Sequence, residues 1–154
     1  MRGIIPPLVT PFRVDGVLDL AAFEANLEAY AAWDLAGYLV LGSNGEAATL
    51  EEHEKLALLT AARRLSSGRM LLAGTGQEST RATVAFTRKA ADLGADAALV
   101  LTPHYYKPQM TVDALRRHYE AVADASPIPE LLNTVPALTR QPTPPHGRPA
   151  RQNL

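Results

Sequence analysis

The chain has 154 residues, 47% of them hydrophobic, and a formal net charge of −1. This length allows one domain with a buried core and excludes a closed eight-unit barrel, which needs ~250 residues. The balanced charge argues against nucleic-acid binding, and the absence of cysteine excludes disulfides and thiolate chemistry. The amino terminus resembles neither a signal peptide nor a membrane span, so we expect a cytoplasmic protein with no membrane contact.

Short apolar runs alternate with longer segments of helical periodicity. We predict strands over residues 4–9, 38–41, 70–73, 97–101 and 128–132, and helices over 20–33, 50–65, 79–93 and 112–125. The strands are nearly all apolar, which suits a sheet covered on both faces. Strand–helix alternation predicts an α/β fold with a parallel sheet. We therefore expect a partial (β/α)8 barrel of about four βα units plus a fifth strand.

Residues at the predicted helix ends support this assignment. Asp19 can cap the first helix, and Thr49 with Glu52 matches a capping box for the second. Gly94 follows the third helix and ends it. In the fourth helix, one face gathers Val112, Leu115, Tyr119 and Val122.

The character of the sequence changes after Pro136. Residues 141–149 contain four prolines and no apolar periodicity, so they supply neither ladder hydrogen bonds nor a core-facing stripe. We predict a domain over residues 1–138, an incomplete barrel, and a disordered Pro/Arg-rich tail over residues 139–154. A truncated or frame-shifted end and a natural flexible terminus are both compatible with this pattern.

Candidate functional residues follow the predicted strands. Gly42-Ser43-Asn44-Gly45-Glu46 comes directly after the run 38–41, and places backbone N–H groups and small donors where an anion can bind. Thr102-Pro103-His104-Tyr105-Tyr106-Lys107-Pro108 comes directly after the run 97–101. Both stretches also suit ordinary loops, because Ser, Asn, Gly and Pro are the usual turn residues.

Several motifs in the right order resemble the dihydrodipicolinate synthase and N-acetylneuraminate lyase superfamily, over about residues 3 to 139. Residues 7–12 are similar to its opening strand, 42–46 to its carboxylate-binding loop, 73–76 to the end of its third strand, and 102–108 to its tyrosine loop. The resemblance implies a TIM-barrel class I aldolase, lyase or synthase that binds a pyruvate-type 2-keto acid as a Schiff base. The Ser43-Asn44 pair is most similar to the 4-hydroxy-2-oxoglutarate aldolase branch; dihydrodipicolinate chemistry is the other reaction considered.

The resemblance also implies roles for individual residues. Ser43 and Asn44 would bind the keto-acid carboxylate, and the Ser43 hydroxyl would also pass protons. Tyr105 would be a relay tyrosine that reaches into a neighbouring subunit, so we expect a homo-oligomer. Asn133 stands where the family has a further tyrosine. An amide is no general acid or base near neutral pH, so we expect a broken proton relay.

The Schiff-base lysine of the family lies on its sixth strand, beyond the recognisable sequence. Lys55, Lys89 and Lys107 fall on outer helices or in the tyrosine loop, whereas a catalytic amine needs a desolvated pocket. We therefore expect a chain that is inactive as it stands. The alternative is a non-catalytic fragment that folds or assembles only with itself or with a full-length relative.

We expect no cofactor and no metal. The histidines are His53, His104, His118 and His146, and they show neither the spacing nor the accompanying carboxylates of a metal site. We interpret each as a surface or loop residue.

Overall fold

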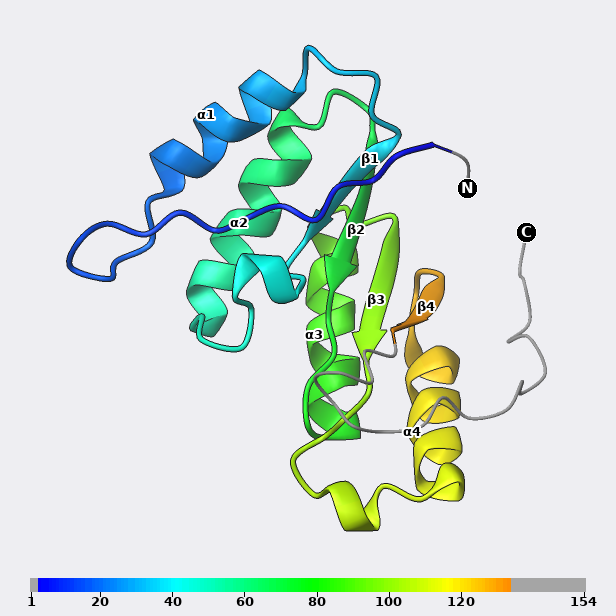
Figure 1. The fold of residues 1–154 in the computed structure, drawn as a ribbon. Helices are drawn as coiled ribbons and strands as arrows, with labels where there is room; N and C mark the ends of the chain where they lie inside the picture. Colours follow the sequence, from blue (N-terminus) through cyan, green and yellow to red (C-terminus); the bar gives the residue numbers. More distant parts are fainter. Residues whose placement is uncertain (1–2, 134–154) are drawn as a thin grey trace.

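The computed structural model describes residues 3–133, which form one parallel sheet in the order β1-β2-β3-β4 (Figure 1). The strands are β1 Gly37–Val40, β2 Met70–Gly74, β3 Ala97–Leu101 and β4 Glu130–Asn133. The helices are α1 Leu20–Tyr30, α2 Glu52–Leu65, α3 Thr80–Asp92 and α4 Val112–Ala125, with single 3-10 turns η1 Ser43–Gly45 and η2 Lys107–Gln109. Each pair of adjacent strands is joined through a helix, which confirms the predicted α/β fold.

Alternate residues of the strands face opposite sides of the sheet. Tyr38 of β1 pairs with Leu71 of β2, and both side chains are fully buried in the core that the helices cover. Leu39 and Leu99 lie on the other face and line an open cavity. A second apolar cluster joins β3 to α4 and contains Ala98, Val100, Leu115, Tyr119 and Val122.

The amino-terminal segment runs beside β1 without forming a regular strand. Pro7 makes a single parallel bridge with Leu39. The Leu8 N–H donates to the Leu39 carbonyl at 2.8 Å, and the Leu39 N–H donates to the Pro6 carbonyl at 3.0 Å. The strand predicted over residues 4–9 is thus reduced to this bridge, because Pro6 and Pro7 have no N–H to donate to a ladder.

Two of the predicted helix ends are confirmed. Asp19 is the N-cap of α1, and its Oδ1 accepts from the Ala22 N–H at 3.0 Å. Gly94 follows α3 with a φ of 87°, a left-handed conformation that ends the helix. On α4, Val112 is exposed instead of facing the core, because it occupies the first helical position, and the other three residues of the predicted face are buried.

The capping box predicted from Thr49 and Glu52 is wrong. The Thr49 hydroxyl donates to the Glu46 carbonyl at 2.8 Å, inside an extra turn that precedes the helix. The box is made by Glu51 and Glu54, since the Glu51 N–H donates to Glu54 Oε2 at 2.8 Å and the Glu51 side chain accepts in return. Helix α2 therefore starts at Glu52.

Arg69 fixes the turn between α1 and β1. Its Nε donates to the Leu35 carbonyl at 3.2 Å, and its Nη2 donates to the carbonyls of Ala31 at 2.9 Å and Trp33 at 3.2 Å. Carbonyls at a helix carboxyl end lack intrahelical donors, and a cation there also suits the helix dipole. The turn that leads into β1 is thus held by the residue that precedes β2, at the end of the sheet opposite to the candidate site. None of the helices within residues 3–133 is long and apolar enough to cross a bilayer.

Candidate functional site

The loop after β1 presents Ser43 and Asn44 at the carboxyl end of the sheet. Leu41 takes a left-handed φ of 64°, and η1 then folds back so that the Gly45 N–H donates to the Gly42 carbonyl at 3.0 Å. The buried Thr10 hydroxyl donates to the Gly45 carbonyl at 2.7 Å and ties the loop to the amino-terminal segment. Ser43 and Asn44 remain exposed, with side chains free of the core.

Ser43 and Asn44 line an open cavity of about 350 Å³. Its other lining residues are Pro7, Leu39, Gly42, Leu99 and Asn133. The cavity therefore combines one hydroxyl and two amides with an apolar wall. This composition suits a small ligand that has a carboxylate at one end and a methyl group at the other. Of the predicted site residues, the structure brings Ser43, Asn44 and Asn133 together.

Buried hydroxyls support the strand ends around this cavity. The Thr102 and Tyr119 side-chain oxygens lie 2.9 Å apart, and the Thr102 N–H donates to the Asn133 carbonyl at 3.2 Å. The fully buried Thr87 hydroxyl donates to Thr75 at 2.9 Å. Burial raises the pKa of Tyr119, and the Thr102 hydrogen bond opposes that rise. These hydroxyls are used by the fold, and the sequence patterns do not reveal their pairing.

Tyr105 does not line the cavity. The residue is 75% exposed, and its ring contacts that of Tyr106 edge to face, with centroids 4.9 Å apart. Its loop is attached to Glu78, whose carboxylate accepts the backbone N–H groups of both His104 and Tyr105. Tyr105 was predicted from the sequence and Glu78 was not. The signal for Glu78 is an acidic residue in the loop after β2, beside the loop after β3.

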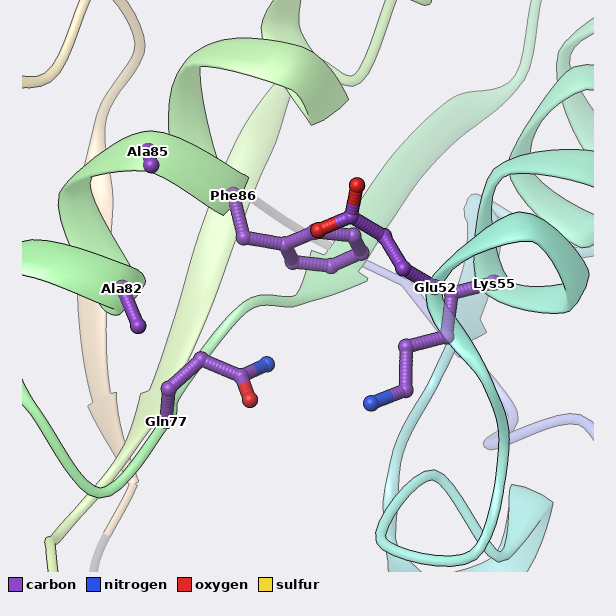
Figure 2. Close-up of a pocket in the computed structure, with 6 residues that line it drawn as sticks. All are labelled: Glu52, Lys55, Gln77, Ala82, Ala85 and Phe86. Carbon is purple, nitrogen blue, oxygen red and sulfur yellow. The ribbon is translucent and has the colours of Figure 1, made fainter.

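No lysine of residues 3–133 lines the cavity of Ser43 and Asn44. Lys89 pairs with Glu52 on the helical side. Lys55 lines a separate pocket of about 160 Å³ between α2 and α3. Figure 2 shows Lys55 and Gln77 pointing into this second pocket from opposite sides, with Phe86 beside them.

His118 is buried, contrary to the surface position predicted for it. Its Nδ1 lies 2.9 Å from the Thr80 hydroxyl, and its ring contacts that of Tyr119. Burial lowers the pKa of His118, and the charge of Glu78 acts in the opposite direction. In the part of the chain that the structure describes, no group of three or more His, Asp or Glu side chains could hold a metal ion.

Curated relatives share extended sequence with this chain. The 4-hydroxy-tetrahydrodipicolinate synthase of Xanthomonas axonopodis pv. citri is 46% identical over 140 residues, which cover 90% of this chain and 46% of the relative. The enzyme of the same name from Methanothrix thermoacetophila is 39% identical over 140 residues, with the same coverage. The chain therefore spans about half the length of the curated relatives it matches.

Solved structures show the same likeness. A chloride-inhibited dihydrodipicolinate synthase from Acinetobacter baumannii, complexed with pyruvate, gives a TM-score of 0.85 at 37% identity, over 90% of this chain and 47% of the other. YagE from E. coli K12, in complex with pyruvate, gives 0.84 at 35% identity, over 90% and 46%. The model of the Dihydrodipicolinate synthetase family matches residues 1–146. This chain belongs to the dihydrodipicolinate synthetase family.

Proposed function

We propose that this chain carries the carboxylate-binding part of a class I aldolase site for pyruvate-type 2-keto acids. The observation that carries the proposal is the cavity in which Ser43 and Asn44 face an apolar wall that includes Leu39 and Leu99. The Ser43 hydroxyl and the Asn44 amide are donors of the kind that a carboxylate accepts. Two structural neighbours whose solved complexes contain pyruvate support the ligand class.

In the proposed reaction, the keto-acid carbonyl condenses with a lysine amine and releases water. The resulting iminium accepts the electron pair of the bond between the α and β carbons when that bond breaks, which gives an enamine and an aldehyde. In the reverse direction the enamine attacks the aldehyde carbon to form the bond, and water then releases the lysine amine. The described residues would contribute binding and orientation, and the role proposed for the Ser43 hydroxyl is to pass a proton. The amine corresponds to the lysine that the resemblance puts on the sixth strand of the family.

Two residues define what we propose for the proton relay. Tyr105 is exposed and does not line the cavity of Ser43 and Asn44 in the same chain. This position suits a phenol that enters the corresponding cavity of a second copy in a homo-oligomer. Asn133 lines the cavity at the position of the family's other tyrosine, and its amide can hydrogen-bond to a ligand without transferring a proton. We therefore propose that the chain binds keto acids and has little or no turnover.

The Ser43-Asn44 pair favours one reaction within the family. As the family reaction from which this site derives, we propose cleavage of 4-hydroxy-2-oxoglutarate to pyruvate and glyoxylate over dihydrodipicolinate chemistry; the chain as it stands keeps the binding part of that site. The alternative from another class is a non-catalytic fragment that assembles with itself or with a full-length relative. Asn133 favours this alternative, because its amide stands where the family relay needs a phenol.

Titration of the 15N-labelled chain with pyruvate tests the binding site. We expect millimolar affinity and amide shifts centred on Ser43 and Asn44, because a few hydrogen bonds to a carboxylate contribute ~1.5–3 kcal/mol each before the losses of binding. Asn44→Asp should weaken binding about tenfold by charge repulsion. Asn26→Asp, which adds the same charge on α1, is the matched control and should bind as the wild type does.

Equal pyruvate affinity in Asn44→Asp and Asn26→Asp would contradict the proposed site.

Trapping with pyruvate and borohydride separates catalysis from binding. We expect no adduct on Lys55, Lys89 or Lys107, because none of these lysines is among the residues that line the cavity. An adduct mapped to one of these lysines would assign the amine there and reject the binding-only state.

A further inference from the structure

Glu78 places both of its carboxylate oxygens on the loop that follows β3. Its Oε2 accepts the backbone N–H of His104 at 3.0 Å and that of Tyr105 at 2.9 Å. Its Oε1 lies 3.1 Å from His104 Nδ1. One carboxylate therefore engages two successive peptide groups and the adjacent imidazole. Hydrogen bonds to an ionised acceptor are roughly twice as strong as neutral ones.

These contacts fall in the middle of the tyrosine loop, residues 102–108. Its start is anchored by Thr102, which is buried against Tyr119. Its end turns into η2, where the Gln109 N–H donates to the Tyr106 carbonyl at 2.9 Å. Between these anchors Tyr105 is exposed, and burial of apolar surface contributes little to fixing it. The carboxylate bonds thus set the backbone direction at Tyr105.

Two imidazoles from different elements interact electrostatically with this carboxylate. His104 belongs to the tyrosine loop and forms an ion pair with Glu78 when it is protonated. His118 belongs to α4, is bound to Thr80 of α3, and feels the Glu78 charge. The Glu78 carboxylate, just before α3, therefore binds the tyrosine loop directly and acts on His118 of α4 through its charge.

We propose that Glu78 is a positioning residue, which orients Tyr105 by holding the peptide groups of His104 and Tyr105. It acts on the phenol through the backbone and is not itself a catalytic residue. The value of this orientation for proton transfer rests on the function proposed above. The contacts that carry the inference are independent of any keto acid.

Amide spectroscopy of the full chain, without keto acid, tests the assignment. An N–H that donates to a carboxylate changes its chemical shift when that carboxylate is protonated. We expect acid that protonates the Glu78 carboxylate to shift the His104 and Tyr105 amides in the wild type. Glu78→Gln should abolish these shifts, since its amide does not titrate. Glu28→Gln, at an exposed site on α1, is the matched control and should keep them.

Hydrogen exchange at neutral pH gives a second readout. Glu78→Ala should speed exchange of the His104 and Tyr105 amides about tenfold or more, through loss of their charge-assisted bonds. The α3 and α4 amides should stay protected and show that the fold persists. Titration of both loop amides in Glu78→Gln as in the wild type, or unchanged exchange in Glu78→Ala, would overturn the assignment. A failure of pyruvate to bind bears on the proposed function alone.

Discussion

Glu130 begins β4 with a carboxyl group that lies in an apolar setting. Its Oε1 is buried and has no hydrogen-bond partner among residues 3–133. Burial raises the pKa of Glu130 from 4.5 to about 7. The Glu130 charge, in turn, adds to the rise in the pKa of Tyr119 on α4. The surroundings of Glu130 at the start of β4 therefore favour its protonated, neutral form over the carboxylate.

This burial makes stability depend on pH. Between pH 4.5 and 7 the folded chain holds a proton on Glu130 that the unfolded chain has released. The contribution is complete below 4.5 and is lost as the pH rises through about 7, at most about 3 kcal/mol. Glu130→Gln should flatten this decline in urea unfolding measured at pH 5 and pH 8, whereas Glu28→Gln should leave it in place. The same decline in both variants would show that Glu130 is not its source.

His118 acts with the opposite sign. Its pKa is lowered by burial, so the folded chain resists protonation of this imidazole. Stability from His118 is present above its ordinary pKa of 6.5 and is lost as the pH falls through the lower folded value. Glu130 lowers stability as the pH rises and His118 lowers it as the pH falls, so the two contributions oppose each other where their titrations overlap.

Helix α4 depends on its first turn. Thr111 is the N-cap, and its side-chain oxygen accepts from the Ala114 N–H at 3.2 Å. Thr111→Ala should lower the free energy of unfolding by about 1 kcal/mol, because this N–H loses its partner. Thr60→Ala removes an exposed threonine inside α2 and should be neutral or slightly stabilising. Equal urea midpoints for the two variants would argue against a capping role.

Regular elements were predictable where periodicity and boundary residues agree. The segment Val112–Ala125 and the strand Ala97–Leu101 match their predicted ranges, since an apolar stripe or run ends at a clear boundary in each. Thr49 misled the prediction because its hydroxyl has a competing partner, the Glu46 carbonyl. A capping pattern in the sequence does not show which backbone group the threonine hydroxyl will bond to.

The candidate site was predictable only in part. Ser43 and Asn44 follow a strand directly, so their position at the sheet end could be expected from local sequence. Glu78 acts on peptide groups 26 and 27 residues away, and a backbone donor leaves no signature in side-chain patterns. The burial of His118 was missed for a related reason, because a polar residue beside an apolar stripe reads as exposed until its partner, Thr80, is known.

At the scale of the molecule, β4 is the last strand of the described sheet, and Leu132 on it is 57% exposed. An apolar residue on a sheet edge favours pairing with another chain. We expect association at tens of micromolar, measured by sedimentation, and a lower mass for Leu132→Lys. Val14→Lys adds the same charge at a fully exposed site and should leave the mass unchanged. A monodisperse wild-type monomer would refute this expectation.

The hydrogen bonds that Arg69 makes to the turn between α1 and β1 also bear on what tryptophan fluorescence can report. Trp33 is the single tryptophan of the chain, and its carbonyl is held by Arg69 at the end of the sheet away from Ser43 and Asn44. Trp33 is already 65% exposed, so we expect its emission to resemble that of a solvated indole before any unfolding occurs. We therefore expect tryptophan emission to report on the turn between α1 and β1 and not on events in the cavity of Ser43 and Asn44.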